Sequence, residues 1–398
     1  MKKIHHLEGV RAIGALIVFV CHFQIAFVPA FYDLFLLKLK TILPAKLSSF
    51  IVYLVDLNIN GNMFLHIFWA LSAYVIFKKF FQYTGQQQFL LSASVKRYFR
   101  LMIPCAASIF FSYFLFKAGF IYITRIHIHV LQQNLYAFPP SFLHALKDSI
   151  WNTLFDYDFY NSYNGPLWTI EREFYGSLFC FALFGIIGKA KNRAIFYAII
   201  FGCVFMLKMY WLNSFLFGYY LSDYDFSEKT ASPVYNIIDK INKYIERHQT
   251  LAFLLFLLVF MAGRIVLYKK PWDLDMINSV LCFLVIFITL RIDFITRLMS
   301  LKILTGLGKI SFGLYLLHWP IMCAFSAWFY VTFNHDTNAS LTLLFVLTTV
   351  IALFLSWLFY KYIDLNSIKW SGKIASYFKK ITDNNAPVVA IDKQAKSA

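Results

Sequence analysis

Long apolar runs separated by short polar segments dominate the chain. Backbone polar groups need partners inside lipid, and these runs do not alternate as barrel strands do, so we predict helical spans. The pattern indicates about ten of them, near residues 10–29, 58–77, 101–121, 173–188, 194–210, 212–222, 250–268, 276–292, 310–331 and 341–361. The sixth run is too short to cross alone, and Gly218 within it is consistent with a tilted, broken or re-entrant helix.

The composition agrees with an all-α integral membrane protein. Hydrophobic residues make up 60% of the 398 residues and charged residues only 14%, whereas a soluble domain carries about 25% charge. The six cysteines lie inside apolar runs without a CxxC pair, which is typical of small core residues and implies no disulfide framework. The N-terminal Lys2, Lys3 and apolar run also resemble a signal peptide, but no clear cleavage site follows, so we expect a retained first span.

The net charge of +17 follows from lysines and arginines in alternate loops between the apolar runs. This bias predicts that both termini are cytoplasmic, and it makes a nucleic-acid partner unnecessary. We expect a transmembrane domain over residues 1–365 and a cytoplasmic, partly disordered tail over 366–398.

Two ionisable residues stand in the first span, where such groups are costly and usually functional. Arg11 and His22 are eleven residues apart, which puts them about 20° from the same helix face. The axial separation is about 16 Å, so Arg11 lies near the cytoplasmic interface and His22 beyond mid-span. Interfacial snorkelling of Arg11 and an inter-helix hydrogen bond of His22 are the structural alternatives.

Arg97 and Arg100 have i,i+3 spacing at the cytoplasmic start of a span, which suits a phosphate clamp. The usual excess of Lys and Arg in cytoplasmic loops, which sets the orientation of membrane helices, explains these two arginines equally well. Glu173 lies at the predicted outer start of the fourth span, where its carboxylate would orient a histidine or hold a hydroxyl, or would simply complement the helix dipole.

The segment GKISFGLYLLHWPI places Ser311, Tyr315 and His318 on one helix face. An outer loop over 122–166 carries the aromatic and polar stretch FDYDFYNSYNGP, whose residue types suit carbohydrate or an interfacial cap. No metal-ligand spacing, phosphate-binding loop or dinucleotide fingerprint is present, so we expect no bound metal.

Together these motifs resemble the membrane acyltransferase-3 family over about residues 4–365. The resemblance rests on six segments in the family's order: LEGVRAIGALIVFVCHF, FWALSAYVIF, KRYFR, PLWTIEREFYGS, ISFGLYLLHWPI and KYIDLNSI. The chain departs from the family pattern at Ala73, where Gly is usual, at Phe312, where Tyr is usual, and at Asp364, which replaces Glu and lacks the following Pro.

The resemblance implies a bacterial enzyme of the cytoplasmic (inner) membrane that takes an acyl group, expected to be acetyl, from cytoplasmic acyl-CoA. The acceptor would be a hydroxyl of an extracytoplasmic glycan or lipid-linked saccharide, such as O-antigen or exopolysaccharide. His22 would be catalytic with Glu173 beside it, Arg11, Arg97 and Arg100 would bind the donor, and no cofactor would be held permanently.

A further expectation concerns the acceptor. We predict that Tyr157, Asp158 and Tyr160 line an outward-facing cleft above His22. The alternative function is a transporter that moves a polar or anionic solute along the same intramembrane His and Arg residues, although no second Arg-x10-His helix suggests inverted repeats. The sequence leaves open the acceptor hydroxyl, the oligomeric state, and whether His22 acts as a base or carries the acyl group.

Overall fold

The computed structural model describes residues 5–28, 40–58, 61–82, 90–126, 134–190, 193–227, 233–269, 274–333 and 338–384. These residues form helices and connecting loops with no strand among them, as predicted. The helices are α1 (His5–Phe27), α3 (Ala45–Asn58), α4 (Gly61–Gln82), α5 (Leu90–Lys117), α7 (Phe142–Lys147), α8 (Thr153–Phe155), α9 (Trp168–Ile187), α10 (Arg193–Met206), α11 (Trp211–Phe226), α12 (Pro233–Arg247), α13 (Gln249–Lys269), α14 (Leu274–Arg291), α15 (Asp293–Met299), α16 (Lys302–Ile321), α17 (Ala327–Thr332), α18 (Asn338–Phe359) and α19 (Leu365–Asn384). Short 3-10 or π turns lie at Ile123–Arg125, Asp148–Asn152, Gly165–Leu167, Met322–Ser326 and Tyr360–Asp364.

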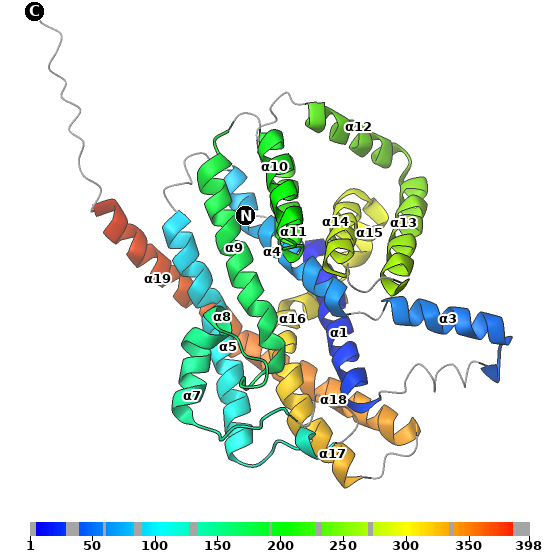
Figure 1. The fold of residues 1–398 in the computed structure, drawn as a ribbon, viewed down its shortest axis with the longest axis vertical. Coiled ribbons are helices and arrows are strands. Elements are labelled where there is room, and N and C mark those ends of the chain that lie inside the picture. Colours follow the sequence, from blue (N-terminus) through cyan, green and yellow to red (C-terminus); the bar gives the residue numbers. More distant parts are fainter. Residues whose placement is uncertain are drawn as a thin grey trace, which may run out of the picture.

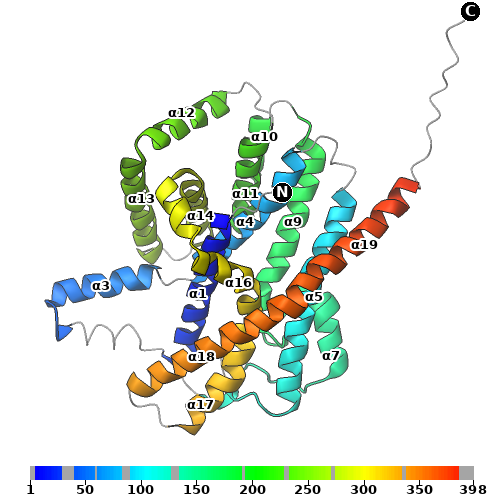
Figure 2. The ribbon, with the colours of Figure 1, turned by 180° about the vertical axis from the view of Figure 1, so that it is seen from behind.

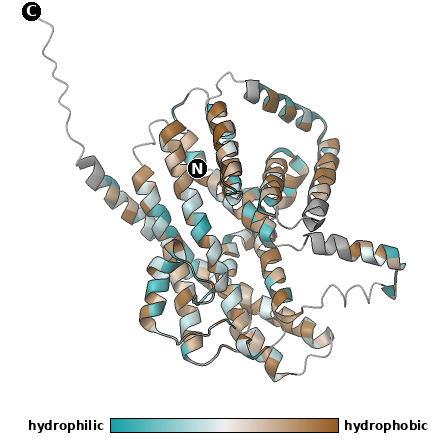
Figure 3. Ribbon diagram, in the orientation of Figure 1, coloured by the Kyte–Doolittle hydropathy of each residue, from teal (hydrophilic) through white to brown (hydrophobic). Residues whose placement is uncertain are grey.

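The centre of the bundle is built from α1, α4 and α16. Helix α4 packs along α11 and α14, while α1 packs along α16, and α16 in turn contacts α18 (Figures 1 and 2). Large apolar side chains are also exposed on the outside of the bundle, among them Ile186, Ile199, Leu258 and Phe354. Hydrophobic residues recur along most of the helices (Figure 3). An apolar exterior around a packed interior is what a lipid environment requires.

Five helical segments are long and apolar enough to cross a membrane: 5–27, 61–82, 90–117, 302–332 and 339–379. Two further segments qualify only if a bent pair counts as one span, with a bend of 112° between α12 and α13 and of 95° between α14 and α15. The described chain therefore has five to seven candidate spans. The predicted spans at α9, α10 and α11 form helices, but they are too short or too charged to meet the same criterion.

Of the tilted, broken and re-entrant alternatives for the sixth run, a break at Gly218 is excluded. Helix α11 is continuous through Gly218, whose missing side chain lets the helix approach the backbone of α4. A Cβ at this position would collide with the carbonyl of Ala70. Gly218 is thus a small residue at a tight helix–helix contact, which sequence alone does not distinguish from a helix break.

Two helices extend beyond their predicted bounds. Helix α5 begins at Leu90 instead of near residue 101, because Arg97 and Arg100 pair with carboxylates of neighbouring helices and can therefore remain inside the bundle. Helix α19 continues the direction of α18 to Asn384 and packs against α5 (Figure 2). The rest of the predicted tail lies outside the described residues, so its disorder stays a prediction.

Candidate active site

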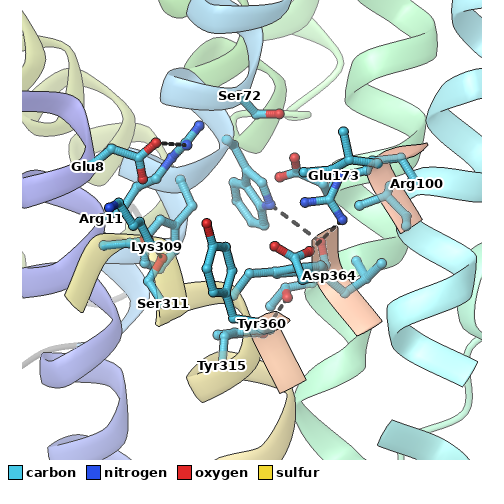
Figure 4. Close-up of a pocket in the computed structure, with 18 of the residues that line it drawn as sticks. Glu8, Arg11, Ser72, Arg100, Glu173, Lys309, Ser311, Tyr315, Tyr360 and Asp364 are labelled. Atoms are coloured by element: carbon cyan, nitrogen blue, oxygen red, sulfur yellow. Dashed lines mark hydrogen bonds and ion pairs between the residues drawn. The ribbon is translucent and has the colours of Figure 1, made fainter. Parts of the chain in front are cut away.

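Most of the predicted site residues meet in one cavity of about 330 Å³, here called the arginine pocket (Figure 4). Its walls come from α1, α4, α5, α9, α16 and the junction between α18 and α19. The polar residues that line it are Glu8, Arg11, Ser72, Arg97, Arg100, Thr169, Glu173, Lys309, Ser311, Tyr315, Tyr360 and Asp364. The three arginines predicted to bind the donor are therefore neighbours, as are Ser311 and Tyr315.

Arg97 is held by partners from two helices. Its guanidinium donates hydrogen bonds to Ser72 Oγ at 2.8 Å and to Ser177 Oγ at 3.0 Å, and it forms an ion pair with Glu173. We had expected Glu173 to support His22, but the structure turns its carboxylate towards Arg97, because α9 packs directly on α5. In the described chain no contact joins Glu173 to His22.

Arg100 has a carboxylate partner of its own. The guanidinium lies 2.7 Å from an oxygen of Asp364, donates to Ser367 Oγ at 2.8 Å and covers the ring of Phe312 at 5.4 Å. Asp364 stands where the resemblance places a glutamate, and that match was the only signal that could have assigned it to the site. Arg11 is more loosely paired, because its nearest distance to Glu8 is 3.8 Å.

A second cavity, the histidine pocket, lies further along α1 and has a volume of about 290 Å³. It is lined by Val18, Cys21, His22, Ile25, Gly61, Asn62, Leu65, Trp168, Thr169 and Tyr315. Leu65, Thr169 and Tyr315 also line the arginine pocket, so they form the wall between the two cavities. The wall is held in place by Tyr315, whose hydroxyl donates to the Pro166 carbonyl at 2.7 Å and contacts Thr169 Oγ1.

His22 is hydrogen-bonded to His318, with 2.7 Å between His22 Nδ1 and His318 Nε2. The planes of the two rings make an angle of only 4°, and their centroids are 5.0 Å apart. This centroid distance is close to the sum of the N···N distance and the two ring radii, the value expected when the rings lie side by side in one plane. The rings therefore meet edge to edge along the hydrogen bond and are not stacked. Trp319 packs against the His22 ring at 66° and 5.5 Å, which further restricts its orientation.

The partners of His318 fix the tautomer of both rings. His318 Nδ1 lies 3.0 Å from the Leu314 carbonyl, which can only accept, so this nitrogen carries a hydrogen. In a neutral ring His318 Nε2 is then an acceptor, and His22 Nδ1 must donate to it. The remaining nitrogen, His22 Nε2, keeps its lone pair, and no partner for it is found within the described residues.

The predicted acceptor residues lie outside both pockets. The Tyr157 hydroxyl donates to the Gly165 carbonyl, while Asp158 accepts from the Tyr160 backbone N–H at 3.0 Å and from the Asn161 amide at 2.9 Å. The bond from Asn161 lowers the pKa of the exposed Asp158 carboxyl. The acceptor role of these residues stays a prediction. Trp168, just after the same loop, does line the histidine pocket.

The loop itself is anchored by the buried Asp148. This carboxylate accepts hydrogen bonds from the Tyr163 backbone N–H and from Ser162 Oγ, both at 3.3 Å. Burial raises the pKa of Asp148, and those two bonds oppose the rise. The segment before α9 is thus a folded cap whose own hydrogen bonds position the start of that helix.

Sequence reasoning also missed a polar cluster around His66, a buried residue of α4. His66 Nδ1 lies 2.7 Å from Ser214 Oγ, and its Nε2 lies 3.2 Å from Asp275, which in turn is 3.7 Å from Arg172. The Arg172 guanidinium covers the ring of Trp168 at 4.9 Å. A histidine inside an apolar span was the available signal. The cluster touches the histidine pocket through Trp168, which lines it.

Comparison with known families decides the broad class of the protein. The sequence model of the acyltransferase-3 family, described as an acyltransferase domain, matches residues 4–361. The chain belongs to this family. No curated protein and no solved structure matches the chain. Membership of the acyltransferase-3 family supports a membrane acyltransferase. Among the described residues no group of three or more His, Cys, Asp or Glu is arranged to hold a metal ion.

Proposed function

We propose that the protein is an integral-membrane O-acyltransferase. It moves an acyl group from cytoplasmic acyl-CoA to a hydroxyl of an extracytoplasmic glycan such as O-antigen or exopolysaccharide. The acyl group that we propose, and would test first, is acetyl. The observation that carries the proposal is the pair of adjacent cavities, one lined by Arg11, Arg97 and Arg100 and the other by His22, which share the lining residues Leu65, Thr169 and Tyr315. Such a pair gives a donor and an acceptor separate entrances to one reacting centre.

The hydrogen-bond chain of His22 supports a general-base mechanism. The lone pair of His22 Nε2 takes the proton of the acceptor hydroxyl as its oxygen attacks the thioester carbon. The C–S bond then breaks, and the imidazolium returns the proton to the departing thiolate of CoA. His318 accepts the hydrogen bond of His22 Nδ1–H throughout, which keeps the ring oriented and stabilises its positive charge.

The donor would enter through the arginine pocket. Arg11 and His22 are separated along α1 by about 16 Å of helical rise, and a pantetheine arm is about as long. The thioester would reach His22 at the wall formed by Leu65, Thr169 and Tyr315, so these side chains have to shift while the acyl group passes. Tyr315 is the residue on which this movement depends, because its hydroxyl fastens the wall to Pro166.

The membrane topology follows from the same proposal. The arginine pocket faces the cytoplasm, both termini are cytoplasmic, about ten helices cross or enter the membrane as the apolar runs indicate, and the membrane is the bacterial inner membrane. Helices α9, α10 and α11 would complete the count as short or tilted segments inside the bundle.

The direct test is deletion of the gene followed by NMR of the surface polysaccharide. The O-acetyl signals are expected to disappear on deletion. They should return when the wild-type gene is restored, and not when the His22→Ala gene is supplied. An unchanged O-acetyl spectrum would contradict the proposal. The transporter alternative predicts solute flux without acyl transfer, and none of the described contacts favours it.

A further inference from the structure

A third cavity, the lysine cleft, lies beside the arginine pocket and has a volume of about 560 Å³. It is bounded by the end of α4, the first turns of α5, and α19. Five cations line it: Lys79, Lys96, Arg97, Arg100 and Lys379. Because Arg97 and Arg100 also line the arginine pocket, the two cavities are adjacent.

The charges of the two cavities differ in kind. The arginine pocket contains the carboxylates of Glu8, Glu173 and Asp364, which neutralise its guanidiniums. Among the described residues no carboxylate lines the lysine cleft, and no ion pair there involves Lys79 or Lys96. A concave surface lined by positive charges without carboxylates attracts an anion strongly. The cleft is therefore a better phosphate site than the predicted clamp of Arg97 and Arg100 alone.

We propose that the lysine cleft binds the phosphate-bearing nucleotide end of the acyl-CoA donor. This subsite rests on the proposed function. The phosphates lie between Lys79, Lys96 and Lys379, and the pantetheine arm passes Arg97 and Arg100 into the arginine pocket. The thioester then arrives at the wall before His22, so the three cavities form one continuous route for the donor.

The proposal gives α19 a function of its own. Gly372, Ala375, Ser376 and Lys379 on this helix line the cleft, although they lie beyond residue 361, where the match with the family ends. A Cβ at Gly372 would meet no atom within 4 Å, so the helix leaves open space at that position. Gly372→Leu should therefore fold normally, since leucine is the better helix former, while its side chain fills part of the cleft.

Anionic phospholipid headgroups carry the same chemistry as the nucleotide phosphates, so the experiment separates the two. The affinities of CoA and of pantetheine, which lacks the nucleotide and every phosphate, are measured for the purified full chain in nanodiscs made of phosphatidylcholine alone or with phosphatidylglycerol. Lys79→Gln combined with Lys96→Gln should weaken CoA binding about tenfold or more, as expected for lost hydrogen bonds to charged groups. Binding of pantetheine should change less than about twofold.

Matched variants complete the test. Gly372→Leu should weaken CoA but not pantetheine, and Lys373→Gln, which changes an exposed lysine of α19 outside the cleft, should change neither. Two results would overturn the subsite alone. One is a wild-type CoA affinity in the lysine and glycine variants. The other is retention of phosphatidylglycerol that depends on the lysines while CoA affinity is unchanged. Failure of the wild-type protein to bind CoA at all would overturn the donor assignment, and the subsite with it.

Discussion

Replacement of His318 tests whether the histidine pair drives catalysis. His318→Ala removes the acceptor of the His22 Nδ1–H bond, which is 2.7 Å long, and leaves that hydrogen without its partner inside the bundle. A hydrogen bond to a charged group contributes roughly 1.5–3 kcal/mol. If this hydrogen bond mainly stabilises the His22 imidazolium in the transition state, its loss should lower kcat about 10- to 150-fold. KM for acyl-CoA should change little, since His318 lines none of the donor cavities described above.

The assay is transfer of a radiolabelled acetyl group from acetyl-CoA to de-O-acetylated surface polysaccharide by the purified protein in nanodiscs. His318→Gln is the matched variant, because its side-chain oxygen can still accept from His22, and it should restore most of kcat. Size-exclusion profiles and melting temperatures establish that each variant is folded. Wild-type kcat in His318→Ala, or an equal loss in the Ala and Gln variants, would refute the positioning role.

Three further predictions concern other parts of the site. His22→Ala should lower transfer by about 10²–10⁴ in rate while the protein inserts and melts normally; near-normal acetylation of the polysaccharide would contradict its assignment. Arg97→Gln should destabilise the protein by about 1–3 kcal/mol because it leaves the half-buried Glu173 carboxylate without its partner. The double variant with Glu173→Gln should be more stable than Arg97→Gln in thermal unfolding; additive losses would show that the pair is not coupled. Alanine at Tyr157, Asp158 and Tyr160 should raise KM for the glycan at least several-fold and leave acyl-CoA affinity unchanged, and an unaltered glycan KM would remove these residues from the acceptor site.

Helical periodicity was sufficient to predict that Arg11 and His22 share one face of the first helix. The structure places them in the two adjacent cavities, in the order along α1 that the sequence suggests. The grouping of Arg97 with Arg100 followed from the same rule. Local spacing works for these residues because each pair lies on a single helix.

Contacts between distant segments were not predictable from one sequence. His22 and His318 are 296 positions apart, and nothing in either segment specifies that their rings meet edge to edge. The partner of Glu173 depended on the packing of α9 against α5, which turned the carboxylate to Arg97. Gly218 left the sixth run ambiguous because a glycine that permits close helix packing and one that breaks a helix look the same in a sequence.

The measurement that tests the central claim most directly is a two-sided transfer assay. Proteoliposomes of known orientation would hold de-O-acetylated surface polysaccharide on the face of the histidine pocket and receive radiolabelled acetyl-CoA only on the face of the arginine pocket. The account predicts that label appears on the polysaccharide across the membrane with the wild-type protein and not with His22→Ala. Labelling only when both substrates share one face, or labelling that persists in His22→Ala, would contradict a donor route from the arginine pocket to His22.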